Sequence, residues 1–106
     1  MKLLISLMLM IPVLASMAAS VMLSWDANNP AEKVTEYRVY EQQGTNWVKV
    51  GGTTNIFTTL TNVLPGVHTY AVTAANMWEE SQKSVPVTSP PIPSQPGKVV
   101  MVVVGP

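Results

Sequence analysis

Apolar and polar residues alternate along most of the chain after residue 20. Val21, Leu23 and Trp25 share one face of an extended segment, and Tyr37 and Val39 share one face of another. Side chains two positions apart point to the same side of a strand, so each segment predicts a half-buried β-strand. Further strands are predicted over residues 47–50, 56–61, 68–75 and 84–88, and no stretch keeps a helical period over three turns.

Turn-forming residues separate these segments. Gly44 lies in a predicted hairpin turn, the pair Gly51-Gly52 is expected to end the third strand, and Leu64-Pro65-Gly66 forms a further turn. Pro86 cannot donate to a ladder, which predicts an edge position for the last strand. Several short strands at hairpin spacing predict an all-β, antiparallel sandwich or barrel.

The first twenty residues follow a different pattern. Lys2 is followed by an uncharged apolar run over residues 3–15 and then by small residues, which is the layout of a secretory signal peptide. Small residues allow cleavage after Ala18 or after Ser20. The alternative is an uncleaved membrane anchor, but the run is short for a span of about 20 residues and contains Pro12. We therefore expect a secreted, periplasmic or cell-surface protein that meets a membrane only through this segment.

Composition narrows the possible functions. Six basic and six acidic side chains balance each other, so nothing predicts the basic patch that nucleic-acid binding needs. The chain has no Cys and one His, which excludes a thiolate or multi-histidine metal site. We expect no metal and no cofactor.

The side chains that could perform catalysis are few, and each has a structural interpretation. His68, the only imidazole, points to the core side of a predicted strand. Asp26, Asn28 and Asn29 lack the spacing of a calcium loop and are interpreted as turn formers. The pair Glu79-Glu80 is interpreted as a solvated loop tip. The sequence thus predicts no catalytic residue and no enzyme.

The order of the motifs resembles the fibronectin type III family. Five segments resemble strands and turns of that family: VMLSWD at residues 21–26, YRVY at 37–40, VLPG at 63–66, HTYAVTA at 68–74 and the strand that ends near Val87. The resemblance covers residues 21–88 and implies an immunoglobulin-like β-sandwich of bacterial or phage type. It also implies a core that contains Trp25, Leu23, Tyr37, Val39, Tyr70 and Val72, with Trp25 at its centre.

Two departures from the family pattern stand out. His68 occupies the place of the family's corner tyrosine, so the corner hydrogen bond is either absent or made by an imidazole. The predicted signal peptide runs directly into the Trp25 strand, so no residues remain for the family's first strand.

The C-terminal segment offers a replacement for that strand. Residues 89–98 form a proline-rich linker, and residues 99–106 contain an unbroken apolar run. We expect the run to pair with the open edge of its own Trp25 strand, or with a neighbouring copy by strand exchange. The remaining alternative is a frayed tail or the start of a truncated second module. The candidate pairing residues are Val99, Val100, Met101, Val102, Val103 and Val104.

Binding is the function class that remains. Trp78 and Met77 in the loop before the last strand, with Trp47 beside a hairpin turn, are the candidate contact residues, because exposed Trp dominates binding hot spots. Trp78 could instead fold back and cap the sandwich. The sequence predicts an exported, non-enzymatic binding or adhesion module that contacts protein or cell-surface carbohydrate. The alternative is a structural subunit of a surface layer, fibre or phage virion.

Overall fold

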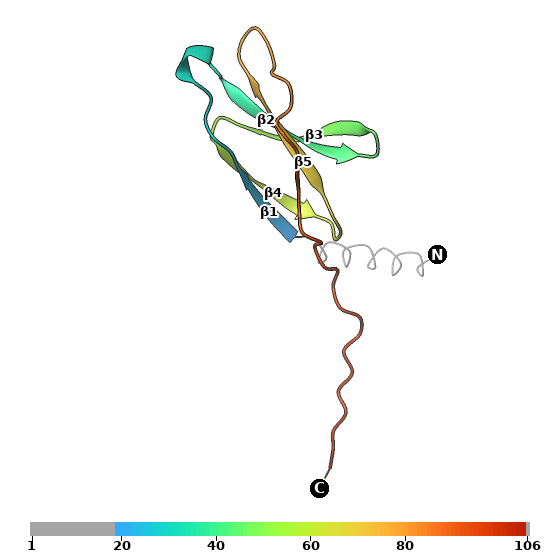
Figure 1. The fold of residues 1–106 in the computed structure, drawn as a ribbon. Helices are drawn as coiled ribbons and strands as arrows, with labels where there is room; N and C mark the ends of the chain where they lie inside the picture. Colours follow the sequence, from blue (N-terminus) through green and yellow to red (C-terminus); the bar gives the residue numbers. More distant parts are fainter. Residues whose placement is uncertain (1–18, 106) are drawn as a thin grey trace, which may run out of the picture.

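The computed structural model describes residues 19–105, and these form two antiparallel β-sheets packed face to face (Figure 1). The predicted all-β antiparallel sandwich is therefore confirmed. The elements, in chain order, are β1 (Ala19–Ser24), the 3₁₀ turn η2 (Pro30–Glu32), β2 (Glu36–Gln43), β3 (Asn46–Thr53), β4 (Phe57–Val63), β5 (Thr69–Ala75) and β6 (Val87–Thr88).

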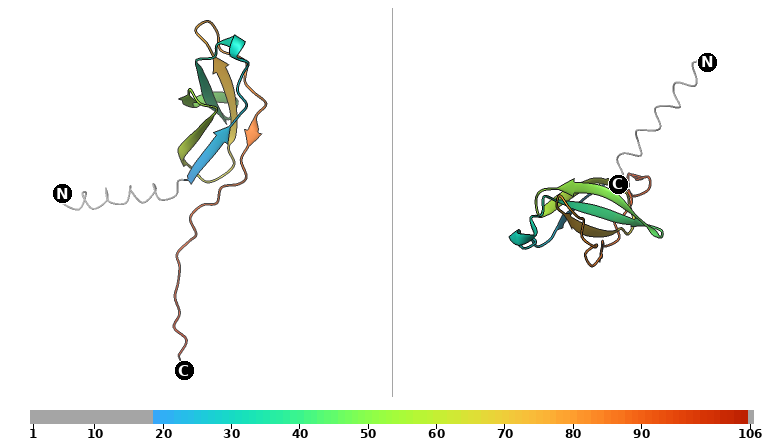
Figure 2. Two further views of the ribbon diagram at one scale, coloured as in Figure 1. Left: turned by 90° about the vertical axis from the view of Figure 1, so that its left-hand side faces the viewer. Right: turned by 90° about the horizontal axis from the view of Figure 1, so that it is seen from above.

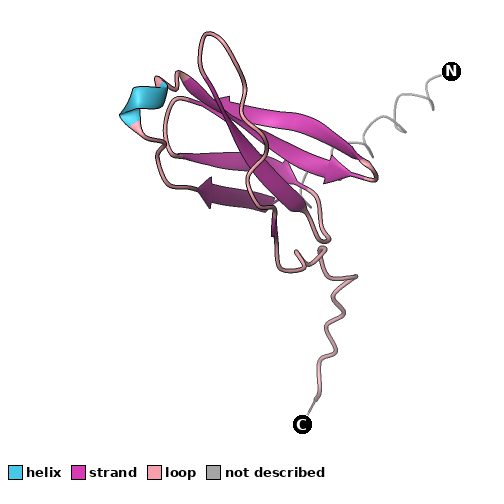
Figure 3. Ribbon diagram, turned by 45° about the horizontal axis from the view of Figure 1, so that its top comes forward, coloured by secondary structure: helices cyan, strands magenta, loops and turns pink. Residues whose placement is uncertain are grey.

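The two sheets differ in width. One holds four strands in the order β3-β2-β5-β6, and the other holds only β1 and β4 (Figure 3). Within residues 19–105, no strand lies beside the second edge of β1. No helix in this part of the chain is long and apolar enough to cross a membrane.

The register of β2 on β5 builds the core. Tyr37 lies opposite Ala74, and Val39 lies opposite Val72, so these side chains share the inner face of the four-stranded sheet. Val39 is fully buried and Tyr70 is 2 % exposed. The alternation of apolar residues in the sequence predicted this face.

The centre of the core is not where the family resemblance placed it. Trp25 follows the end of β1, is only half-buried and leans on Tyr37 with ring centroids 5.5 Å apart. The largest fully buried side chains are Tyr70 and Val39. Because β1 has an uncovered edge, Leu23 and Trp25 stay partly open to solvent.

The third strand is longer than predicted. It continues through Gly51 and Gly52 to Thr53, so the expectation that the glycine pair ends it is wrong. A bulge between Val39 and Tyr40 shifts the register there. A Cβ at Gly51 would lie 3.4 Å from a methyl group of Leu60, so the glycine lets a β4 side chain pack close to β3.

The N-terminal boundary also differs. β1 begins at Ala19, whereas the sequence placed residues 1–20 in a signal peptide. Ala19 pairs with Val63 of β4. The rest of the predicted signal peptide, residues 1–18, lies outside the described residues.

The last strand is attached to β5 in an unusual way. β6 has only two residues and forms the sheet edge, as the proline predicted. Three serines around it each form two hydrogen bonds with one residue in or next to β5. The serine N–H donates to the carbonyl of that residue, and the serine Oγ accepts from the N–H of the same residue at 2.9 to 3.0 Å. The pairs are Ser81 with Ala74, Ser84 with Val72, and Ser89 with His68.

The C-terminal tail does not pair with its own sheet. Ile92 still bridges to Gly66, but residues 99–104 form no strand and lead away from the sandwich (Figure 2). Their side chains are 70 % to 88 % exposed. The expectation that the tail supplies the first strand within one chain is therefore not met.

Truncating the centre of the core should destabilise the fold strongly. We expect Val39→Ala to lower the free energy of unfolding by about 2–3 kcal/mol, because it removes two buried methyl groups and leaves a cavity. Urea unfolding followed by tryptophan fluorescence measures this. The matched control is Val85→Ala, at a position 90 % exposed, which should change stability by less than about 0.5 kcal/mol. Equal effects would contradict the assigned core.

Candidate functional site

The loop between β5 and β6 presents the two most exposed candidate contact residues. Met77 is 77 % exposed and Trp78 is 66 % exposed, so Trp78 does not fold back to cap the sandwich. Figure 1 shows this loop projecting beyond one end of the sheets, beside η2. The arrangement puts a large aromatic and a flexible apolar side chain together at one end of the molecule.

Asn76 holds this loop in a defined shape. Its side-chain Oδ1 accepts from the N–H groups of Trp78 and Glu79, both at 2.9 Å, and its own N–H donates to the Glu79 carbonyl at 3.0 Å. Its Nδ2 donates to the Glu32 carbonyl of η2 at 2.9 Å. Four hydrogen bonds thus involve Asn76: three order the backbone of the tip, and the fourth ties the tip to the neighbouring loop.

Trp47 lies apart from this tip. It is half-buried on the outer face of the four-stranded sheet, where the ammonium group of Lys83 stands 4.9 Å from the Tyr40 ring centroid and 5.8 Å from that of Trp47. The structure therefore does not join Trp47 with Met77 and Trp78 in one site. The cation over two rings was not predicted, because Lys83 lies more than thirty residues from both aromatics in sequence.

A second feature that the sequence did not predict is the anchoring of Glu80. Its carboxylate accepts from the Thr73 hydroxyl at 2.6 Å, the Tyr40 hydroxyl at 2.5 Å and Arg38 Nη1 at 2.9 Å. Arg38 also pairs with Glu36 at 3.3 Å. Glu80 is exposed, as the interpretation as a solvated acid requires, but its carboxylate is held by fixed donors and does not project freely from the loop tip.

These donors stabilise the charged form of Glu80. The hydroxyl of Thr73, then that of Tyr40 and the guanidinium of Arg38, lower the pKa of Glu80 to about 2. Hydrogen bonds from three donors favour the ionised carboxylate over the protonated acid. Its role is to hold the start of the β6 segment on the outer face of β2 and β5.

His68 makes the corner contact that the family usually assigns to tyrosine. Its Nε2 lies 2.7 Å from the Leu64 carbonyl, four residues upstream, and its Nδ1 lies 2.5 Å from a carboxylate oxygen of Glu41. A carbonyl and an ionised carboxylate both accept, so this pair of partners favours the protonated, positively charged imidazole. The carboxylate of Glu41, and then the Leu64 carbonyl, raise the pKa of His68 above its ordinary value.

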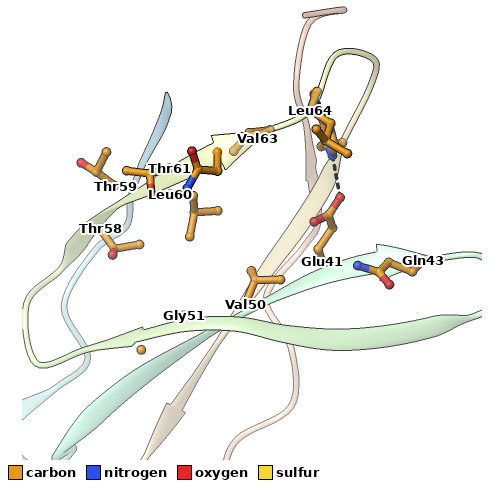
Figure 4. Close-up of a pocket in the computed structure, with 13 residues that line it drawn as sticks. Glu41, Gln43, Val50, Gly51, Thr58, Thr59, Leu60, Thr61, Val63 and Leu64 are labelled. Carbon is orange, nitrogen blue, oxygen red and sulfur yellow. Dashed lines mark hydrogen bonds and ion pairs between the residues drawn. The ribbon is translucent and has the colours of Figure 1, made fainter. Parts of the chain in front are cut away.

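A cleft opens next to this corner, between the edges of β3 and β4 (Figure 4). Its volume is about 460 Å³. Val50 and Gly51 line it from β3, Leu60 and Thr61 from β4, and Glu41 closes one end. Because the charged groups in it are already paired with each other, the cleft offers hydroxyl and backbone groups rather than a reactive side chain.

The described residues hold no cluster of His, Asp and Glu side chains that matches a metal site. The only histidine has both ring nitrogens engaged, and the carboxylates of Glu41 and Glu80 are already hydrogen-bonded.

Comparisons with known proteins support the fold. FN3tt, a fibronectin type III structure, superimposes with a TM-score of 0.59 and 18 % identity, over 66 % of this chain and 73 % of that chain. The twitchin kinase region from C. elegans, which includes a fibronectin type III domain, gives a TM-score of 0.56 and 23 % identity, over 64 % of this chain and 13 % of that chain.

A scan against protein-family models gives no match, and a search of curated proteins finds no significant relative. At these identities the structural likeness concerns the fold alone. The chain folds as a fibronectin type III-like β-sandwich, and the fold implied by its sequence motifs is confirmed.

The charge of His68 can be tested by titration. We expect NMR of the single histidine to give a pKa above 6.5 and Glu41→Gln to lower it, because the neutral amide removes the carboxylate partner. A raised folded-state pKa contributes stability that is complete below 6.5 and is lost as pH rises through the folded pKa. The free energy of unfolding should thus fall above pH 6.5, and fall less in the variant.

Glu79→Gln is the control for that titration, because Glu79 lies at the opposite loop and does not contact His68. An unchanged pKa of His68 in the Glu41→Gln variant would contradict the ion pair.

The Glu80 anchor predicts a response to acid. Glu80→Gln should lower the free energy of unfolding at neutral pH by about 1 kcal/mol, because charge-assisted hydrogen bonds become neutral ones at a partly exposed site. A lowered carboxyl pKa contributes stability that is lost as pH falls, so the difference from wild type should shrink between pH 4.5 and about 2. Urea unfolding at several pH values measures this, and a difference that is constant over that range would oppose the assignment.

Proposed function

We propose that this protein is an exported, non-enzymatic binding module that contacts protein or surface carbohydrate through the tip formed by Met77 and Trp78. The observation that carries the proposal is the exposure of these two side chains on a loop that Asn76 holds in place. The fibronectin type III-like fold is consistent with a binding or structural module.

The physical case rests on pre-organisation. An exposed tryptophan leaves a large apolar surface in water, and burying that surface against a partner is favourable. Because the Asn76 contacts already order the tip, a partner that binds it need not fix the backbone. The exposed, charged residue Glu79 follows Trp78 directly in the loop, which gives the apolar pair a polar neighbour of the kind found at the rim of an interface.

Export is part of this proposal. The N-terminal segment has the layout of a signal peptide, and the position of β1 favours one of the two cleavage points. Cleavage after Ala18 leaves β1 whole, whereas cleavage after Ser20 removes its first two residues and the Ala19–Val63 pair. We therefore propose that the mature protein begins at Ala19.

A second function, assembly into a surface structure, has its own supporting observation. The outer edge of β1 is unpaired within residues 19–105, and residues 99–104 are an exposed apolar segment able to form a strand. Exposed strand edges and exposed β-forming segments both favour pairing between chains. A subunit of a fibre, surface layer or phage virion would use both features.

The contact role of the tip predicts a loss of surface attachment. In cells that express the full chain, Trp78→Ala should weaken retention of the exported protein on the cell surface by at least about tenfold, because a hot-spot tryptophan carries much of a contact's affinity. Comparing the protein in washed cells with that in the medium measures this.

Met22→Ala is the matched control, because Met22 is 69 % exposed on the outer face of β1 and belongs to no proposed contact. Circular dichroism should show an unchanged fold in both variants. Surface retention that is insensitive to Trp78→Ala would remove the tip as the binding site.

A further inference from the structure

A groove runs between β1 and the β6 segment. Two adjoining hollows of about 300 and 170 Å³ form it, and they share Trp25, Asp26, Val72 and Ser84 in their linings. Leu23 and Val87 extend the apolar lining toward the other end of β1. The larger hollow is mainly apolar, whereas polar residues such as Asn28, Ser81 and Gln82 line most of the smaller one. Asp26 is the one acid in either lining.

The unpaired edge of β1 borders this groove. β4 occupies the other edge of β1 and lies beside β3, so the free edge faces β5 and β6 at the opposite side of the sandwich. The indole Nε1 of Trp25, at the end of β1, is buried without a hydrogen-bond partner in residues 19–105. An added strand would give backbone partners to the β1 edge and would cover Leu23 and Trp25.

The apolar tail has the dimensions of such a strand. Residues 99–104 are six residues, as β1 is, and each length corresponds to about 20 Å of β-strand. Five of the six are valine, a strong strand former, and the sixth is Met101. Their exposed fractions of 70 % to 88 % leave this apolar surface in water.

We propose that the groove between β1 and β6 receives residues 99–104 of a second copy of this chain, as a strand antiparallel to β1. This inference deepens the assembly function proposed above and does not depend on the Trp78 contact.

Chain length argues against the protein's own tail in this orientation. Ile92 is fixed to Gly66 by two backbone hydrogen bonds of 2.8 and 3.0 Å, and Gly66 lies near the beginning of β1, because β4 ends at Val63 opposite Ala19. An antiparallel strand must start at the other end of β1, about 20 Å away. Residues 93–98 cover about 19 Å as an extended proline-rich segment, which leaves none to reverse the chain direction.

Charge favours the antiparallel orientation over the parallel one. An antiparallel tail places Lys98 at the end of the groove that holds Asp26, whereas a parallel tail places it near Ala19. Neither Lys98 nor Asp26 has an ion-pair partner within the described part of the chain. The orientation that pairs them is the one that a second copy can supply.

The alternation of a strand provides a sharp test. Two threonine variants retain the length and β-propensity of the tail: one changes Val100, Val102 and Val104 to Thr, and the other changes Val99, Met101 and Val103 to Thr. Only the set that faces the groove should matter. We expect it to weaken self-association at least about tenfold, while the outward-facing set changes it by less than about threefold.

Light scattering and sedimentation of the protein purified from cells that express the full chain, over a range of concentrations, measure the association. The wild type should show mass above the monomer that rises with concentration. A monomer at all concentrations overturns the proposal, whether the tail is frayed or is protected from hydrogen exchange in its own groove. Equal weakening by both threonine sets also overturns it, because it indicates unspecific adhesion.

Charge reversal tests the orientation independently. Lys98→Glu and Asp26→Lys should each weaken association about two- to fivefold, the range of an exposed ion pair, and the double variant should regain it. Failure of the double variant to recover would overturn the antiparallel placement. Trp78→Ala should leave association unchanged, so that loss of surface attachment and loss of assembly remain separate results.

Discussion

The structure depends on a mismatch in width between its two sheets. A two-stranded sheet covers only part of a four-stranded one, so the large apolar side chains of the core are fully buried only in the strip where β1 and β4 lie over β2 and β5. Val39 and Tyr70 occupy that strip and are the largest fully buried side chains. Beyond it, residues that would be central in a wider sandwich, above all Trp25, remain half-exposed. The small core limits the hydrophobic stabilisation that the fold can gain, and polar contacts between distant segments make up part of the difference.

Two carboxylates supply many of those polar contacts. Glu41 holds the charged imidazole of His68 at the turn between β4 and β5, and Glu80 holds the segment after β5 against Arg38, Tyr40 and Thr73. The two groups respond to pH in opposite directions, because the His68 contact is lost as pH rises and the Glu80 contact is lost as pH falls. The fold is therefore most stable at pH values between these two transitions. The Glu80 contacts directly follow the loop that carries Trp78.

Most of the fold could be predicted from the sequence because period-two patterning is a local property. It placed Tyr37, Val39, Tyr70 and Val72 on one face, and the structure confirms this register. Features that depend on partners far along the chain could not be predicted in the same way. The sequence predicts that Gly51-Gly52 ends the third strand, whereas both glycines pair with β2, opposite Val39 and Arg38. The sequence also gives no sign of the donors that hold Glu80, since its partner Tyr40 lies forty residues away. For His68 the sequence left open whether the imidazole makes the corner hydrogen bond, and it did not predict the contact with Glu41.

The serine-based attachment of the β6 segment has a mechanical consequence. The tail leaves the sandwich from this segment, in the general direction in which the chain runs through β6 (Figure 2, left). Tension on the tail would therefore act along β6 and load the hydrogen bonds of this segment in shear, beginning with those nearest the tail. The Gly66–Ile92 bridge would carry the force first, followed by the double contact of Ser89 with His68. In a molecule joined to its neighbour through this tail, the force would pass into the four-stranded sheet. This sheet has the larger number of paired strands and is the part of the sandwich best able to resist the force.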